Sequence, residues 1–238
     1  LADQGLQQMD DGLLKPSKLP PERQAQLRAR FDALAGQIPP ALQRYPGYAP
    51  RLQLEFRSGL GANAFALPGG QVVMTDGLVQ AAAKQGLDDD ALVGVLAHEI
   101  GHVVHRHTTR MVVEQGVLQM GLGLALGDVS GVLSTGGALL TGLHYRRNHE
   151  READCFAIDL MRHAALPTAP MGTLLLAIAH DEDDAEGSQK SGASQPAPQK
   201  QGKAEAAHPI WSLLSSHPDT VERAHALQQG QSPHCSAL

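Results

Sequence analysis

The sequence predicts an α+β chain that is mainly helical and carries one small antiparallel sheet. Three observations support this fold class: an alternating segment at residues 51–57, an acid-capped helical segment that begins near residue 89, and a second long helical segment at residues 143–164. Apolar residues make up 42% of the 238 residues, which is enough for a core. We therefore expect residues 1–238 to form a single domain.

The first elements are a polar lead-in and a helix. Residues 1–20 run up to the pair Pro20-Pro21, and we interpret them as a polar lead-in. Pro21 suits the first turn of a helix, because the N–H that it lacks would have no helical partner there. Helical spacing of apolar residues extends this helix to residue 35. The apolar stripe consists of Leu27, Phe31 and Leu34.

A change of period marks the sheet. Residues 51–57 alternate apolar and polar side chains, as a half-buried strand does. Two further short strands are expected at residues 63–67 and 71–75, separated by the turn residues Pro68-Gly69-Gly70. Together the three segments predict a small antiparallel sheet.

A long helix is expected from about residue 89 to about residue 115. The acids at residues 88–90 can accept hydrogen bonds from the first N–H groups and complement the helix dipole. Residues 116–143 are rich in Gly, Leu, Ala and Val, with Asp128 as their only charge. Two interpretations stay open for them: a helical pair that covers the preceding helix, or a lid or surface that touches lipid or unfolded protein.

The C-terminal half contains the second long helix and a biased segment. Residues 181–207 are first acidic and then rich in Ser, Gln, Pro, Lys and Ala. Such a composition buries too little apolar surface to order itself, so we predict a disordered loop within the domain. A final helical patch is expected at residues 210–229, and it contains His217-Pro218.

Charge, cysteines and the first residue bear on partners and location. The net charge is −6 and no long basic run occurs, which argues against nucleic acid as a partner. Cys155 and Cys235 could form one disulfide, but we favour two free thiols. The chain begins at Leu1 without a signal-type start, so we interpret it as a mature chain or a fragment, which leaves an upstream membrane anchor open. No run of 18 apolar residues occurs.

The most informative motif is H-E-x-x-H at His98-Glu99-Ile100-Gly101-His102. Two histidines four residues apart project from the same side of a helix, ~6 Å apart along its axis. Both imidazoles can then reach one zinc ion at ~2.0–2.1 Å. Glu99, next to the first of them, can act on water beside the ion. The motif predicts a metallopeptidase with one Zn²⁺ per chain.

A catalytic zinc site requires a third protein ligand. His105 lies on the same face, but ~4.5 Å further along the axis than His102, which is too far for a compact site. A histidine six residues beyond His102 is also missing, because residue 108 is a threonine. Glu150 and Asp154 form E-x-x-x-D on one face of the second long helix. We expect Glu150 to bind the ion and Asp154 to accept the free N–H of a zinc-bound histidine.

These residues define a mechanism. Zinc would polarise the scissile carbonyl and lower the pKa of water towards 7, and Glu99 would pass the proton of that water to the leaving amine. A further group must stabilise the oxyanion that develops on the substrate. The candidates are His217, Tyr145 and Arg147, and the sequence does not rank them.

Four segments resemble the gluzincin family that includes the HtpX-type heat-shock proteases, the CAAX prenyl proteases and the periplasmic protease BepA. They cover roughly residues 50–228 in the family's order, although Arg146 replaces the usual serine of the third segment. The segments are N-A-F-A-L-P-G-G at residues 63–70, L-A-H-E-I-G-H at 96–102, Y-R-R-N-H-E-R-E-A-D at 145–154, and H-P with R-A at 217–224.

The resemblance implies a zincin-like metallopeptidase domain with its sheet beside the active-site helix. It implies a zinc-dependent endopeptidase in protein quality control at the bacterial cell envelope, on the periplasmic side, acting on unfolded or misassembled proteins. It places Asn63 on an edge strand that can pair with an extended substrate. It also places His217 near the metal, as an oxyanion donor or as a fourth ligand that keeps the site latent.

Several roles and rivals stay open at this stage. Arg223 and Arg147 could order the site through its carboxylates. One rival function is a latent or non-proteolytic, chaperone-like envelope protein with a closed zinc site. Another is a protein that touches the membrane through residues 116–143 or an anchor upstream. The remaining histidines are expected not to bind the metal: His105, His107, His144, His149, His163, His180, His208, His225 and His234.

Overall fold

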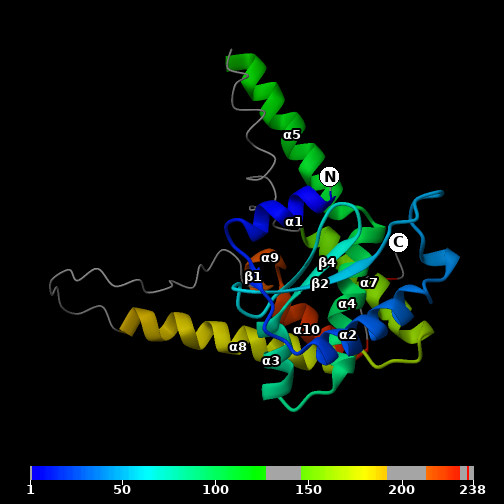
Figure 1. The fold of residues 1–238 in the computed structure, drawn as a ribbon, viewed down its shortest axis with the longest axis vertical. Coiled ribbons are helices and arrows are strands. Elements are labelled where there is room, and N and C mark those ends of the chain that lie inside the picture. The colour runs from blue at the N-terminus through cyan, green and yellow to red at the C-terminus, as the bar shows by residue number, and fades with distance from the viewer. Residues whose placement is uncertain (1, 127–145, 192–212, 231–234, 236–238) are drawn as a thin grey trace.

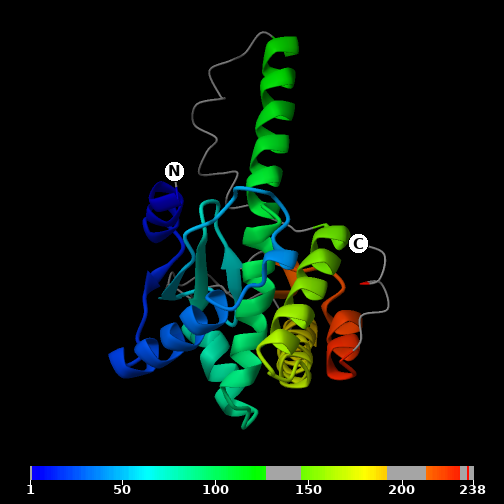
Figure 2. The same ribbon diagram turned by 90° about the vertical axis from the view of Figure 1, so that its right-hand side faces the viewer.

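The structure is a computed structural model, and it describes residues 2–126, 146–191, 213–230 and 235. A buried helix, α4, lies between a small sheet and the C-terminal helices (Figures 1 and 2). The prediction of a mainly helical α+β fold is confirmed. The elements are α1 (Ala2–Asp10), β1 (Lys15–Pro16), α2 (Pro21–Ala35), the 3₁₀ turn η1 (Pro40–Leu42), β2 (Gln53–Ser58), β3 (Ala64–Ala66), β4 (Gln71–Thr75), α3 (Asp76–Lys84), α4 (Asp89–Val104), α5 (His107–Leu126), α7 (Arg147–His163), α8 (Ala169–Ser191), α9 (Leu213–Ser216) and α10 (Thr220–Gln228).

The sheet is mixed rather than antiparallel. Its strand order is β1-β2-β4-β3, with β4 parallel to β2 and antiparallel to β3. All five residues of β4 are buried, as suits a strand with neighbours on both sides. The alternation at residues 51–57 showed which face of β2 is buried, but alternation carries no information about strand order. The expectation of a purely antiparallel sheet was therefore wrong.

The N-terminal segment is more structured than a polar lead-in. Residues 2–10 form helix α1, and β1 joins the sheet as a short antiparallel strand. Apolar residues of this segment pack in a small second core against β3 and β4. This core consists of Leu6, Met9, Leu14, Phe65, Leu67 and Val73. Sparse apolar residues at helical spacing thus sufficed to dock α1, which our interpretation of residues 1–20 missed.

Helix α2 has the predicted bounds, and its apolar stripe is buried. Two ion pairs join it to the start of α4. The guanidinium of Arg23 donates two hydrogen bonds to Asp89, at 2.7 and 2.5 Å, and Arg30 donates to Asp90 at 2.6 Å. The side chain of Asp88 accepts a hydrogen bond from the N–H of Asp90, so the acids cap α4 as expected.

Helix α4 ends at Val104, not near residue 115. Arg106 has a φ of 55°, in the left-handed region, and the chain restarts as α5 at His107. Helix α5 then projects away from the body (Figures 1 and 2). Residues 116–126 therefore do not cover α4, and residues 127–143 lie outside the described part. None of the described helices combines the length and the apolar composition that a bilayer span requires.

The C-terminal helices differ from expectation at their ends. Helix α7 is described from Arg147, and residues 143–145 lie outside the described part. Helix α8 continues to residue 191, so a disordered loop from residue 181 was wrong for its first eleven residues. The N-terminal half of α8 is anchored in the core, and a helix once nucleated extends at little cost through residues of good helix propensity. Residues 192–207 lie outside the described part.

The final helical patch is two helices, because Pro218 and a left-handed Asp219 separate α9 from α10. His217 lies in this turn. Cys155 of α7 forms a disulfide with Cys235, 80 residues later, so the expectation of two free thiols was wrong. Two cysteines alone do not show that two distant segments meet, and the approach of residue 235 to α7 was not readable from the sequence.

Candidate metal centre

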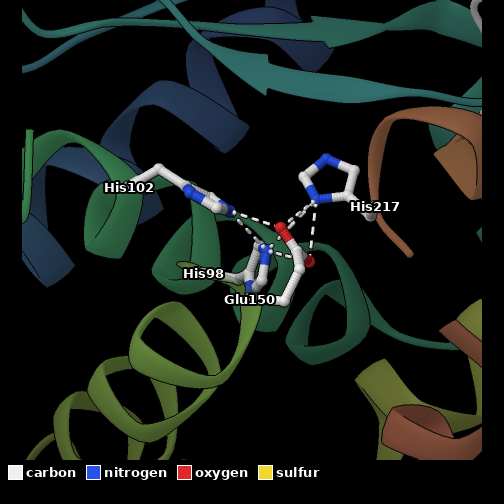
Figure 3. Close-up of side chains that lie close together, drawn as sticks. All are labelled: His98, His102, Glu150 and His217. Atoms are coloured by element: carbon white, nitrogen blue, oxygen red, sulfur yellow. Dashed lines mark hydrogen bonds and ion pairs between the residues drawn. The ribbon is translucent and has the colours of Figure 1, made fainter. Parts of the chain in front are cut away.

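Four buried side chains from three segments converge beside α4. They are His98 and His102 of α4, Glu150 of α7 and His217 of the α9–α10 turn, and we call them the His/Glu cluster. One nitrogen or oxygen of each lies within 4.8 Å of the others. Figure 3 shows the four side chains pointing toward one another. The structure thus brings together the three residues predicted to bind zinc and adds His217 to them.

Close approach of α4 and α7 forms the cluster. Gly101 lies on α4 between the two histidines, and a Cβ at this residue would be 3.1 Å from both the Cα and the carbonyl oxygen of Ala153 on α7. This spacing is tighter than an ordinary van der Waals contact. Glycine at this position therefore permits the helix separation that the cluster requires.

The distances within the cluster suit a shared cation. The Nε2 atoms of His98 and His102 are 2.9 Å apart, and each lies 3.2–3.4 Å from a carboxylate oxygen of Glu150. The Nδ1 atom of His217 lies 3.1 Å from both oxygens of Glu150 and 3.4 Å from Nε2 of His98. Donors bound tetrahedrally at ~2.05 Å are separated by roughly 3.3 Å. Imidazoles with a carboxylate are a donor set for a divalent metal ion.

Asp154 and Arg223 lie behind His98. Nδ1 of His98 donates to Asp154 at 2.9 Å, and Arg223 donates to both oxygens of Asp154 at 2.6 and 2.7 Å. Arg223 also pairs with Glu150. Burial alone would raise the pKa of Asp154, but the Arg223 guanidinium outweighs it and lowers this pKa to about 2. Arg223 thus lies between the two carboxylates and keeps Asp154 ionised.

The electrostatics of the cluster favour a cation. Burial would raise the pKa of Glu150, but His217 and Arg223 hold it well below its ordinary value. Burial would lower the pKa of His98, but the carboxylates of Glu150 and Asp154 raise it to about 9. Burial dominates at His102 and lowers its pKa. The two carboxylates therefore stabilise positive charge on the His98 ring, and a metal ion bound there would replace that proton and supply the charge instead.

Glu99 is a buried carboxyl without a hydrogen bond to any described residue. The ring of His217 lies beside it, with Nε2 3.5 Å from Oε1 of Glu99. Burial raises the pKa of Glu99, and His217 partly offsets this effect. With Val95 of α4 and Leu175 of α8, Glu99 also lines a cavity of ≈ 10 Å³. A buried carboxyl with unused acceptors beside a metal-binding cluster is placed to handle protons.

The edge strand β3 lies against the cluster. The N–H of Thr75 donates to the carbonyl of Asn63, and the N–H of Leu67 donates to the carbonyl of Gln71. Hydrogen-bonded pairs alternate with non-bonded pairs in an antiparallel ladder, so the N–H and C=O of Ala64 point away from β4. The N–H of Ala64 donates to Oδ1 of Asn63 at 2.8 Å, and its carbonyl lies 3.4 Å from Nε2 of His217. Asn63 is buried at the start of β3. His217 therefore contacts both the edge strand and Glu150.

The remaining predicted residues lie elsewhere. Arg147 does not reach the His/Glu cluster: its side chain is 81% exposed and pairs with Asp219 at 2.9 Å. Tyr145 lies outside the described residues. Among the other histidines that the structure describes, none belongs to the cluster. His107, however, bonds directly to His102, a contact that sequence reasoning missed because it assumed an uninterrupted helix.

Comparison with known proteins identifies the family. The profile of peptidase family M48 matches residues 21–231. The mitochondrial metalloendopeptidase OMA1 of Saccharomyces cerevisiae is 34% identical over 105 residues, which cover 43% of this chain and 29% of that protein. OMA1 of Schizosaccharomyces pombe is 34% identical over 118 residues, or 47% and 33% of the two chains.

The chain is also similar to a bacterial protein. A putative beta-barrel assembly-enhancing protease of Vibrio cholerae is 30% identical over 122 residues, which cover 46% of this chain and 24% of that protein. The matched region thus spans a third or less of each relative. The family resemblance predicted from the four sequence segments is confirmed. The chain belongs to peptidase family M48 and carries a metallopeptidase domain.

Proposed function

We propose that this chain is a zinc-dependent endopeptidase that cleaves unfolded or misassembled proteins at the bacterial cell envelope. The observation that carries the proposal is the buried meeting of His98, His102 and Glu150 beside the unbonded carboxyl of Glu99. Two imidazoles and a carboxylate are a usual ligand set of catalytic zinc. A zinc ion held there would act as a Lewis acid toward the substrate carbonyl and toward water.

Glu99 is the proposed general base and acid. Its carboxyl is buried, and burial raises its pKa above the ordinary value of 4.5, a shift in the direction that suits a group that must both accept and release a proton. Glu99 would accept the proton of the attacking water and deliver it to the nitrogen of the leaving amine. Asp154 and Arg223 would hold His98 and Glu150 in place during this transfer.

The substrate is proposed to lie along β3. An extended peptide can add to a sheet edge through main-chain hydrogen bonds, and the peptide groups of Ala64 face such an edge beside the cluster. Asn63 accepts from the N–H of Ala64 and would help to set the position of this strand. Recognition through the backbone suits unfolded proteins of varied sequence.

We further propose that the described conformation is the closed form of the site. Nδ1 of His217 occupies the position of a fourth protein donor, and a zinc ion with four protein ligands has no position left for substrate. Nε2 of His217 also contacts the Ala64 carbonyl, which a pairing substrate would need. These contacts favour the fourth-ligand role of His217 over the oxyanion role in this conformation. A site closed in this way is also what the latent, chaperone-like alternative requires.

The envelope location is supported indirectly. One relative is named as a beta-barrel assembly-enhancing protease, and the Cys155–Cys235 disulfide is typical of oxidising compartments such as the periplasm. Contact with a membrane through residues 116–143 or an upstream anchor stays a prediction, as do the absence of nucleic-acid partners and the single-domain organisation.

The experiment compares cleavage of an unfolded protein such as casein by the zinc-loaded chain and by Glu99→Gln. The matched control is Glu222→Gln, which makes the same change at an exposed residue of α10. We expect Glu99→Gln to lose at least about 100-fold of the activity, within the usual contribution of a general base, and the control to keep it. Equal activity of Glu99→Gln and the wild type would remove Glu99 as the base. No cleavage by the zinc-loaded wild type and by His217→Ala would favour the non-proteolytic alternative.

A further inference from the structure

We propose that His107 and Glu152 form a hydrogen-bonded chain that orients His102 for metal binding. The proposal rests on the metal site of the proposed function, and it assigns positioning roles to two residues outside the His/Glu cluster. His107 was expected not to bind the metal, and no role was predicted for Glu152.

The hydrogen-bonded chain from His102 through His107 to Glu152 is continuous and mostly buried. Nδ1 of His102 lies 2.9 Å from Nδ1 of His107, and Nε2 of His107 lies 2.8 Å from Oε2 of Glu152. His107 is fully buried, whereas the side chain of Glu152 is 18% exposed. His149 stacks on His107 with ring centroids 4.3 Å apart and an interplanar angle of 14°. The plane of the His107 ring is therefore fixed from one face as well as at both nitrogens.

The geometry fixes which group donates and which accepts in each hydrogen bond from His102 to Glu152. Nε2 of His102 faces Glu150 and His98 within the cluster, so a metal ion would bind there and the ring proton would lie on Nδ1. Nδ1 of His107 lies 2.9 Å away, so this proton is donated to it and Nδ1 of His107 accepts with its lone pair. His107 then carries its own proton on Nε2 and donates it to the carboxylate of Glu152. Each of the three groups thereby has a single assigned role.

The two metal-binding histidines of α4 are thus supported in different ways. His98 donates directly to Asp154, and Arg223 forms an ion pair with the same carboxylate. His102 reaches a carboxylate only through His107. Such outer partners fix the tautomer and the ring orientation of a ligand and make it more basic. Glu152 lies two residues after Glu150 on α7, so one helix supplies both a ligand and the support for another.

The break between α4 and α5 makes this contact. In an uninterrupted helix His107, five residues beyond His102, would lie roughly 140° around the axis from it. Arg106 instead adopts a left-handed conformation, and the ring of His105 donates to the carbonyl of Gly101 and closes the end of α4. The backbone turns at this point, and the first residue of α5, His107, lies beside His102. This turn therefore places His107 in the chain of hydrogen bonds.

The test measures metal binding, not turnover. Zinc affinity is determined by competition with a chromophoric chelator, and cobalt loading reports ligand geometry through its visible absorption. The variants are His107→Ala, His107→Asn, Glu152→Ala and Glu152→Gln in the full chain. His225→Ala and Glu114→Ala are the controls, since both residues are exposed and lie outside the cluster. Circular dichroism and thermal unfolding in chelator show which variants are folded before metal is added.

We expect a 10–100-fold loss of zinc affinity and an altered cobalt spectrum in both alanine variants. His107→Asn should recover part of the affinity, because its amide oxygen can accept from His102 as Nδ1 of His107 does. Glu152→Gln, nearly identical in shape, should keep the acceptor and lose the charge, so its loss should be intermediate. Wild-type affinity and an unchanged cobalt spectrum in the folded variants would overturn the proposal, and Glu152→Gln decides it if the alanine variants do not fold.

The proposed function can fail separately. A wild-type chain that binds zinc but cleaves no protein would contradict the peptidase proposal, and the variants would still decide the role of His107 and Glu152. A folded wild-type chain that binds neither zinc nor cobalt would overturn both.

Discussion

Gly101→Ala tests the close packing of α4 and α7 on which the metal centre depends. The added Cβ would lie 3.1 Å from the Cα and the carbonyl oxygen of Ala153, and 3.1 Å from the ring of Phe156. Two of these three atoms belong to the backbone of α7 and cannot rotate away. Overpacking of this kind costs about 1–3 kcal/mol, and the gain in helix propensity from glycine to alanine offsets up to about 1 kcal/mol. We therefore expect a net loss of about 1–2 kcal/mol in the free energy of unfolding.

The same displacement should weaken metal binding. Ala153 lies one helical turn from Glu150, so an α7 pushed outward by a few tenths of an ångström moves that carboxylate away from His98 and His102. The assay is urea denaturation in chelator and in excess zinc. The difference between the two conditions reports the stabilisation by bound metal, which depends on the ratio of free zinc to the dissociation constant. We expect this difference to be smaller in Gly101→Ala than in the wild type.

Gly116→Ala is the matched control, because nothing lies within 4 Å of its added Cβ on α5. It should gain up to about 1 kcal/mol from helix propensity alone and leave the zinc-dependent stabilisation unchanged. The reasoning would be refuted if Gly101→Ala were as stable as the control in chelator and gained as much stability from zinc as the wild type.

Three further predictions concern the disulfide, an ion pair and the closed site. Reduction of the Cys155–Cys235 disulfide, or Cys235→Ser, should lower the free energy of unfolding by about 2–4 kcal/mol, and equal urea midpoints with and without reductant would contradict this. The hydrogen bond from Arg23 lowers the pKa of Asp89 below its ordinary 3.8, so the pair stabilises the fold at neutral pH and this contribution is lost as the pH falls below about 4. The two side chains are 29% and 27% exposed, so solvent screens the pair and Arg23→Gln should cost under about 1 kcal/mol at pH 7. A wild-type–variant difference in urea stability that does not shrink between pH 7 and pH 3 would count against the pair. His217→Ala should raise kcat/KM on an unfolded protein by opening the fourth ligand position, whereas a fall in kcat would assign His217 to the oxyanion instead.

Local chemistry carried much of the prediction. The bounds of α2 followed from a proline start and one apolar stripe, and the cap of α4 followed from Asp88. Helical spacing places His98 and His102 on one face and Glu150 and Asp154 on another, and the need of zinc for a third protein ligand, together with the family resemblance, joined the two motifs in the prediction. The position of Asp154 behind His98 followed from the same helical spacing.

Features that depend on contacts between distant segments were not predictable in this way. The insertion of β4 between β2 and β3 and the Cys155–Cys235 pairing arise from how the chain folds back on itself. Arg106 adopts the left-handed conformation at this turn, although glycine and asparagine are the residues usually found there. The amino-acid type at residue 106 therefore did not indicate a turn. Missing this turn meant that His107 was treated as an ordinary histidine. One signal was present: His105 and His107 follow the motif so closely that a break there would bring one of them back to the site.

Anomalous diffraction at the zinc absorption edge, from crystals of the full chain grown with zinc, tests the joint metal site of α4 and α7 most directly. We predict one peak per chain, at ~2.0–2.2 Å from Nε2 of His98, Nε2 of His102 and a carboxylate oxygen of Glu150. A density map without a peak at this position, or a zinc ion bound there without Glu150, would contradict it.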